Sequence, residues 1–152
     1  MIRPLFAGIL RLVTGARPHY GFIHEGDRAI FFANHTSHLD FALLWASLPK
    51  HVRERTSPVA AEDYWDKPGP RRWMACRVFQ AVLIAREGIK RANNPLDRIG
   101  SAIDAGRSVI IFPEGTRSPD GRPGIFRAGL YHLARRYPDI PLVPVYLENL
   151  NR

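Results

Sequence analysis

The stretch Ala29-Ile30-Phe31-Phe32-Ala33 is followed directly by Asn34-His35-Thr36-Ser37-His38-Leu39-Asp40. An apolar run of this length, bounded by polar residues, is typical of a buried strand. The seven residues after it are therefore predicted to lie where a strand ends and a helix begins. His35 and Asp40 stand in an H-x4-D spacing, so one turn of chain can bring the carboxylate onto the imidazole and make it an oriented base.

The same residues also have a structural interpretation. Ser37 to Asp40 matches the capping-box pattern, in which Asp40 caps the next helix through the Ser37 amide. Taken alone, the H-x4-D spacing favours this cap over a catalytic pair. His38 lies one helical turn from His35, but no third ligand is spaced to join them, so we expect no metal site.

Strand and helix patterns alternate along the rest of the chain. Apolar residues at helical spacing alternate with short continuous apolar runs, and proline or glycine separates many of them. This order predicts an α/β fold with a mostly parallel central sheet flanked by helices on both faces. Pro144 removes a ladder donor, which places the last strand at an edge or a bulge. The predicted helices cover residues 38–48, 94–106 and 127–137, and the strands cover 29–33, 57–61, 81–85, 109–112 and 142–147.

Three polar clusters each follow a predicted strand. They are His35, Arg86 and residues 114–117. The carboxyl ends of parallel strands lie along one edge of a sheet, and ligands of such sheets bind there. The convergence of three clusters on this edge indicates a functional site more strongly than any one cluster does.

Two of these clusters have the chemistry of a phosphate clamp. The guanidinium groups of Arg86 and Arg117 match a phosphate bidentately, and Thr116 with the amides of a glycine-containing turn adds donors. The alternative is that these arginines pair with acids such as Glu87 or Glu114.

The composition limits the class of partner. The chain has 152 residues, enough for one domain, and its net charge of +8 points to nucleic acid, an anionic membrane or phosphorylated substrates. Cys76 is the only cysteine, so we expect neither disulfides nor a cysteine-based zinc site. We expect the protein to work in a reducing, cytosolic environment. The apolar neighbours of Cys76 predict a buried thiol.

Residues 1–20 form a predicted N-terminal interfacial segment, and residues 21–152 form the catalytic domain. The apolar core of the segment is too short to span a bilayer, and it has no small-residue cleavage site of a signal peptide. We expect a helix in the membrane interface with Arg3, Arg11 and Arg17 facing headgroups. An ordinary helix packed on the domain is the alternative.

Four blocks of this sequence resemble the glycerolipid acyltransferases, the family of lysophosphatidate and glycerol-3-phosphate acyltransferases. They occur in the family's order and cover most of the chain. The blocks are Asn34-His35-x-Ser37-x-x-Asp40, the Arg86 that closes Val82-Leu83-Ile84-Ala85, Phe112-Pro113-Glu114-Gly115-Thr116-Arg117-Ser118, and Leu142-Val143-Pro144-Val145.

The resemblance implies transfer of a fatty acyl group from acyl-CoA or acyl-ACP to a hydroxyl of lysophosphatidate or a related glycerol phosphate, in phospholipid biosynthesis. It places a peripheral or monotopic enzyme at the cytoplasmic face of a membrane with anionic lipid. No metal, bound cofactor or nucleic acid is expected. His35 is then the general base, Asp40 orients it, and the Pro144 block borders the acyl site. The acceptor and its phosphate are held by Arg86, Glu114, Gly115, Thr116 and Arg117.

Two departures from the family leave alternatives open. The family usually has a glycine a few residues before its second-block arginine, where this chain has Phe79-Gln80-Ala81. Its members also generally continue well beyond the fourth block, so we expect either a short member or one that lacks a C-terminal piece. The alternatives are an inactive or truncated lipid-binding relative and a basic nucleic-acid-binding module.

Overall fold

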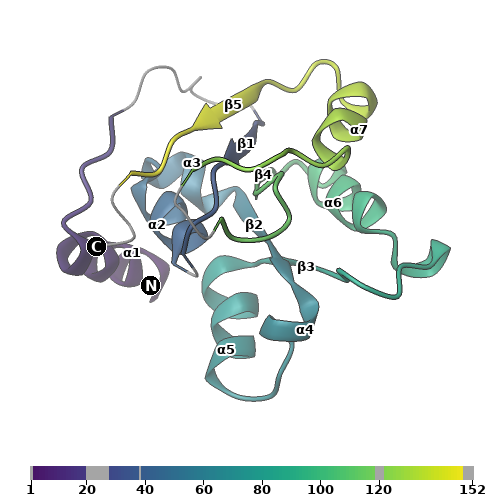
Figure 1. The fold of residues 1–152 in the computed structure, drawn as a ribbon. Coiled ribbons are helices and arrows are strands. Elements are labelled where there is room, and N and C mark those ends of the chain that lie inside the picture. The colour runs from purple at the N-terminus through teal and green to yellow at the C-terminus, as the bar shows by residue number, and fades with distance from the viewer. Residues whose placement is uncertain (1, 20–27, 38, 119–121, 149–152) are drawn as a thin grey trace.

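Figure 1 shows the computed structural model of the chain, which describes residues 2–19, 28–37, 39–118 and 122–148. His38 therefore lies outside the described residues. Every predicted helix and strand is present, with ends shifted by a few residues. In chain order the elements are α1 (Ile2–Thr14), β1 (Ile30–Ala33), α2 (Asp40–Ser47), α3 (Lys50–Glu54), β2 (Thr56–Ala61), α4 (Glu62–Trp65), α5 (Pro70–Trp73), the π-helical turn η1 (Met74–Phe79), β3 (Val82–Ile84), the 3-10 turn η2 (Arg91–Asn93), α6 (Pro95–Asp104), β4 (Ser108–Ile111), α7 (Gly129–Arg136) and β5 (Leu142–Val145).

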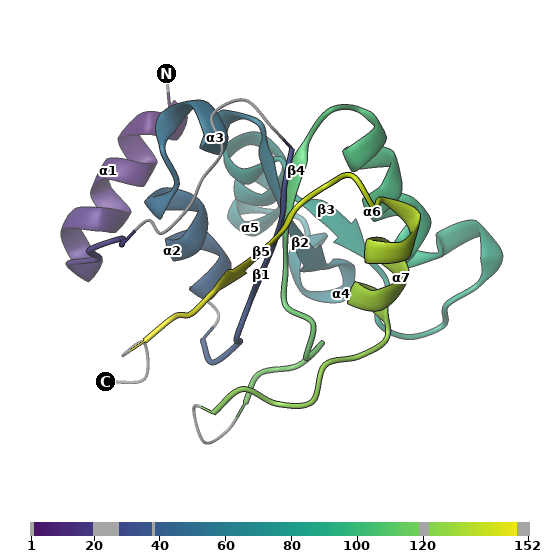
Figure 2. The ribbon, with the colours of Figure 1, turned by 90° about the horizontal axis from the view of Figure 1, so that it is seen from above.

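The strands form one five-stranded sheet in the order β3-β2-β4-β1-β5. All the pairings in the described part of the chain are parallel, which confirms the predicted sheet. Figure 2 shows α1 and α2 on one face of the sheet and α6 and α7 on the other. Parallel strands need such crossovers, and the crossovers bury both faces.

The apolar run of β1 is continuous because both faces of the strand are covered. Successive side chains of a strand point to opposite faces. Phe31 therefore packs in the core beneath α1 and α2, together with Trp45 and Phe79. Ile30 lies in the core beneath α6 and α7, together with Leu133.

The outermost strands are β3 and β5. β5 lies at one edge, as Pro144 predicts. β3 lies at the other edge, where its residues are only half buried. The continuous apolar run at residues 81–85 predicts a buried strand, and β3 differs because a strand at the edge of a sheet has a neighbour on one side only.

Helix α1 packs on α2, and its arginines point inward. Arg3 donates to the backbone oxygen of Arg53 at 3.2 Å, and Arg11 donates to that of Ser47 at 2.6 Å. The prediction that Arg3 and Arg11 face headgroups was wrong. Ser47 ends α2, where carbonyl groups lack helical partners and carry partial negative charge, so a guanidinium is stabilised there.

Gln80 has a left-handed backbone, with φ of 51°. A glycine adopts this conformation without strain, whereas other residues do so rarely. The Gln80 side chain gains contacts that glycine lacks, because its Oε1 accepts from Arg3 at 3.0 Å and from Arg107 at 2.7 Å. Gln80 thereby links α1 to the start of β4.

Cys76 is exposed, so the predicted buried thiol was wrong. It lies in the π-helical turn η1, whose Ala75, Val78 and Phe79 take the buried positions. The apolar neighbours in sequence therefore indicated the core correctly, but Cys76 lies on the outer side of the same turn.

Candidate active site

The site is built where the carboxyl ends of β1 and β4 lie side by side. The two strands are paired in parallel, with Ile30 opposite Val109 and Phe32 opposite Ile111. Their polar loops therefore leave the sheet at the same edge, and His35 meets Glu114 there although 79 residues separate them. The predicted convergence at this edge is confirmed for these two clusters.

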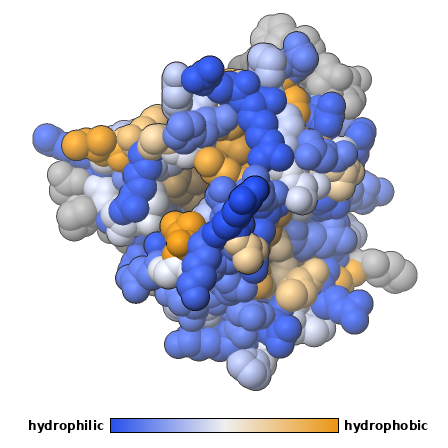
Figure 3. Space-filling model, turned by 90° about the vertical axis from the view of Figure 1, so that its right-hand side faces the viewer, coloured by the Kyte–Doolittle hydropathy of each residue, from blue (hydrophilic) through white to orange (hydrophobic). Residues whose placement is uncertain are grey.

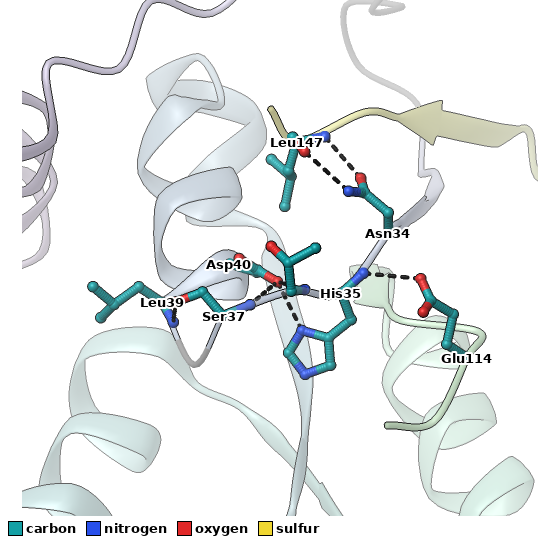
Figure 4. Close-up of polar contacts among 8 residues, drawn as sticks. Asn34, His35, Ser37, Leu39, Asp40, Glu114 and Leu147 are labelled. Atoms are coloured by element: carbon teal, nitrogen blue, oxygen red, sulfur yellow. Dashed lines mark hydrogen bonds and ion pairs between the residues drawn. The ribbon is translucent and has the colours of Figure 1, made fainter. Parts of the chain in front are cut away.

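His35 and Asp40 form the pair that the H-x4-D spacing predicts. His35 Nδ1 lies 2.8 Å from Asp40 Oδ2, and the Asp40 side chain is 0% exposed (Figure 4). The same Oδ2 accepts from the backbone amides of Thr36 at 2.6 Å and Ser37 at 2.8 Å. Asp40 thus accepts from the Ser37 amide and also contacts the imidazole, so both predicted contacts are present. Its role in orienting a catalytic base remains a prediction.

The loop after β4 fixes the backbone of His35. The His35 amide donates to Glu114 Oε1 at 2.9 Å (Figure 4), and the Ser118 amide donates to the His35 carbonyl oxygen at 2.7 Å. Phe112 stacks on the imidazole, with ring centroids 4.3 Å apart and an interplanar angle of 24°. Sequence reasoning placed these residues in the third block but missed that they hold the histidine.

Asn34 ties the start of the motif to the chain that follows β5. Its Nδ2 donates to the Leu147 carbonyl oxygen at 2.9 Å, and its Oδ1 accepts from the Leu147 amide at 2.8 Å (Figure 4). Asn34 is buried, so both ends of its amide need partners. The chain just after the fourth block therefore stabilises the first block.

A cavity of about 420 Å³ opens beside Glu114, in the loop that follows β4. Two arginines, Arg117 and Arg122, are among its lining residues. The sequence predicted Arg117 and Thr116 but missed Arg122, whose only signal was a basic residue shortly after the third block. The lining consists of Glu114, Thr116, Arg117, Ser118, Arg122, Pro123, Gly124 and Ile125.

Gly115 allows the tight turn beside this cavity. Its φ is +70°, and a Cβ at this position would lie 2.8 Å from the Arg127 Nε. Arg127 in turn donates from Nε to the Glu114 carbonyl oxygen at 3.2 Å. A side chain at position 115 would strain the backbone and displace Arg127, so the turn requires glycine.

Arg86 lies at the same sheet edge but apart from His35. It follows β3, and β2 and β4 separate that strand from β1. Its Nε donates to Asp63 Oδ1 at 3.1 Å and its second nitrogen contacts Oδ2. These hydrogen bonds lower the pKa of the Asp63 carboxyl and raise that of the Arg86 guanidinium. The acid partner is Asp63, not Glu87 or Glu114 as the alternative predicted.

Within the described ranges, no group of three or more histidine, cysteine or acidic side chains is arranged to hold a metal ion. The expectation of a reaction without metal or bound cofactor remains a prediction. The chemistry available in the described residues is an imidazole with one nitrogen on a buried carboxylate, and a cavity lined by arginine side chains. Glu114 and Ser118 line this cavity and also contact the backbone of His35.

The fold and the site define an α/β protein that carries an oriented histidine beside an arginine-lined cavity at the carboxyl edge of a parallel sheet. A protein-family model described as Acyltransferase matches residues 18–148, and the chain belongs to that family.

The chain is similar to 1-acyl-sn-glycerol-3-phosphate acyltransferases of plants. It is 33% identical to that of Limnanthes alba over 135 residues, which are 84% of this chain and 43% of the relative. It is 34% identical to that of Cocos nucifera over 125 residues, covering 76% and 37% respectively. The chain thus spans less than half the length of these relatives.

A solved structure has the same fold. The crystal structure of the 1-acyl-sn-glycerophosphate acyltransferase PlsC from Thermotoga maritima superposes with a TM-score of 0.70 at 22% identity. The match covers 93% of this chain and 54% of that protein. The α/β fold predicted from the sequence is therefore confirmed.

Proposed function

We propose that the protein transfers a fatty acyl group from acyl-CoA or acyl-ACP to the free hydroxyl of lysophosphatidate or a related glycerol phosphate, in phospholipid biosynthesis. The names of the plant relatives support this acceptor class. The observation that carries the proposal is the contact of 2.8 Å between His35 Nδ1 and Asp40 Oδ2. This contact uses Nδ1, so the other ring nitrogen, Nε2, is the one that can act as a base.

The reaction follows from this pair. Asp40 keeps the proton of the neutral imidazole on Nδ1, so the lone pair of Nε2 accepts the proton of the acceptor hydroxyl. The oxygen forms a bond to the thioester carbonyl carbon, and the tetrahedral intermediate collapses by breaking the carbon–sulfur bond. The proton on Nε2 then passes to the leaving thiolate, and Asp40 stabilises the imidazolium in between.

The cavity beside Glu114 suits the acceptor. Arg117 lines it together with Thr116, and a guanidinium pairs with a phosphate bidentately. The His35 carbonyl accepts from Ser118, which also lines the cavity, so the cavity and the base share one loop. The Arg86 guanidinium forms an ion pair with Asp63. A role of Arg86 in binding the acceptor remains a prediction.

Release of free thiol tests the proposed reaction. The purified chain is mixed with acyl-CoA in one arm and acyl-ACP in the other, each with and without lysophosphatidate, and thiol is measured with a chromogenic disulfide. We expect release that depends on the acceptor in at least one arm. Binding to lipid vesicles without acceptor-dependent release in either arm contradicts the proposal and favours the inactive lipid-binding relative.

We also propose that the protein works as a peripheral protein at the cytoplasmic face of a membrane, held there by α1. The inward arginines leave the outer side of this helix apolar, with Leu12 85% and Val13 77% exposed. Ile2, Leu5 and Ile9 are also exposed on the same helix. An apolar helix face of this kind partitions into the boundary between headgroups and acyl chains.

The geometry of α1 fits a helix that lies in the interface. Its 13 residues extend about 20 Å, against about 30 Å for the hydrocarbon core of a bilayer. Among the described helices none is long and apolar enough to cross a membrane. The α6–α7 side, opposite α1, is mostly hydrophilic with small separate apolar patches (Figure 3).

Replacing Leu5 and Leu12 together by serine is expected to weaken binding to vesicles by at least about tenfold. Burial of one leucine side chain contributes about 1.5–3 kcal/mol, so loss of two removes a large part of the apolar attraction. Sedimentation with vesicles of phosphatidylcholine and phosphatidylglycerol measures the partition coefficient. Tyr131→Ser on α7 is the control, because Tyr131 is also exposed but lies far from α1. Equal binding of both variants contradicts the role of α1.

A further inference from the structure

We propose that Glu114 is a positioning residue for the catalytic base, which holds His35 through its backbone amide. This role differs from the acceptor-binding role that the family resemblance implies for Glu114. The inference deepens the proposed function and rests on it, because the residue that Glu114 positions is the base of that reaction. It is carried by the burial of Glu114 and by the direction of its hydrogen bond.

Glu114 is only 5% exposed, and Oε1 accepts from the His35 amide at 2.9 Å. The hydrogen bond is partly buried, where an amide left without an acceptor costs free energy, so the bond holds the His35 backbone in place. The Ser118 amide holds the carbonyl oxygen of the same residue at 2.7 Å. Both backbone groups of His35 are therefore set by one loop, and the position of its side chain follows.

The second oxygen of Glu114 is also confined. A Cβ built on Gly124 would lie 3.0 Å from Glu114 Oε2, so the chain passes directly over the carboxylate. Arg117 lines the same cavity and can pair with an anion, whereas a carboxylate repels the phosphate of an acceptor. Glu114 thus suits the task of holding the histidine better than the task of binding the acceptor phosphate.

Reach and charge can be separated at this position. Glutamine has the length of glutamate and keeps an oxygen that accepts from the His35 amide, but it is neutral. Aspartate keeps the charge but is one methylene shorter, so its carboxylate falls short of the His35 amide. A positioning role through Oε1 needs the reach, whereas a role as a charge near substrate needs the charge.

We expect Glu114→Asp to lower kcat by about 10- to 100-fold at an unchanged acceptor KM, because a shift of about 1 Å in a catalytic group costs about 100-fold. Glu114→Gln is expected to retain kcat within about threefold. Glu87→Asp is the matched control, since Glu87 is an exposed carboxylate at the same sheet edge. An active Asp variant beside an inactive Gln variant, or a change confined to acceptor KM, overturns the inference.

Hydrogen exchange of the His35 amide provides a readout that needs no turnover. Glu114→Asp is expected to speed exchange of this amide by at least about tenfold, while the amides of β4 keep their protection and Glu114→Gln keeps that of His35. Unchanged exchange at His35 in the Asp variant overturns the inference. If the wild-type protein transfers no acyl group but the two variants show this exchange pattern, the proposed function is contradicted and the positioning role is still supported.

Discussion

Replacing His35 by alanine is expected to lower kcat by about 10²- to 10⁴-fold, the range that a general base contributes. The side chain is 21% exposed, so its loss leaves no large cavity in the core. Acceptor-dependent thiol release at saturating substrate measures the effect. The acceptor KM is expected to stay near the wild-type value, because the imidazole acts on the hydroxyl in the transition state and the cavity binds the phosphate.

The control for this variant is His132→Ala. His132 is an exposed histidine on α7, so its replacement removes an imidazole without touching the site. Circular dichroism and thermal unfolding verify that both variants fold as the wild type does. Full activity of His35→Ala would show that another group takes the hydroxyl proton, and the proposed mechanism would be wrong.

Replacing Asp40 by asparagine is expected to lower kcat by about 10²- to 10⁴-fold as well. The amide oxygen of the introduced asparagine can take the place of Oδ2 and accept from Thr36 and Ser37, so the turn is retained. The amide is neutral, so the imidazolium that forms during the reaction loses the carboxylate that stabilises it. Wild-type kcat in the folded Asn variant would contradict the orienting role.

Replacing Asp40 by alanine separates the structural role from the catalytic one. Its Oδ2 accepts from two backbone amides and contacts the imidazole, and the side chain is fully buried. We expect the free energy of unfolding to fall by about 2–4 kcal/mol, since the amides of Thr36 and Ser37 lose a charged acceptor. Urea unfolding of the Ala and Asn variants measures this, and the Asn variant is expected to lose clearly less.

Local sequence signals predicted α6 almost to its ends. Asn94 accepts from the Leu96 amide at 3.0 Å as the N-cap, Pro95 opens the helix, and Gly106 follows it with φ of +81°. These signals act between residues that are neighbours along the chain, so the sequence contains both partners of each contact. The H-x4-D pair is local in the same sense, and its contact was predicted for that reason.

Contacts between distant segments could not be predicted in this way. The inward direction of Arg3 and Arg11 depends on where α2 ends in space, and the partner of Arg86 depends on how α4 packs beside β3. The exposure of Cys76 depends on the winding of η1. In each case packing between segments that are distant in the sequence decided the outcome, and neighbouring residues did not.

The sequence by itself determined the order of strands and helices, the parallel sheet and the H-x4-D turn, because periodicity and turn chemistry act over a few residues. Only the tertiary structure decided that Glu114 and Ser118 hold the backbone of His35. It also decided that Arg117 and Arg122 share a cavity while Arg86 stands apart. The physical reason is the strand order: β4 lies next to β1 and brings its loop onto His35, whereas β3 lies at the far edge.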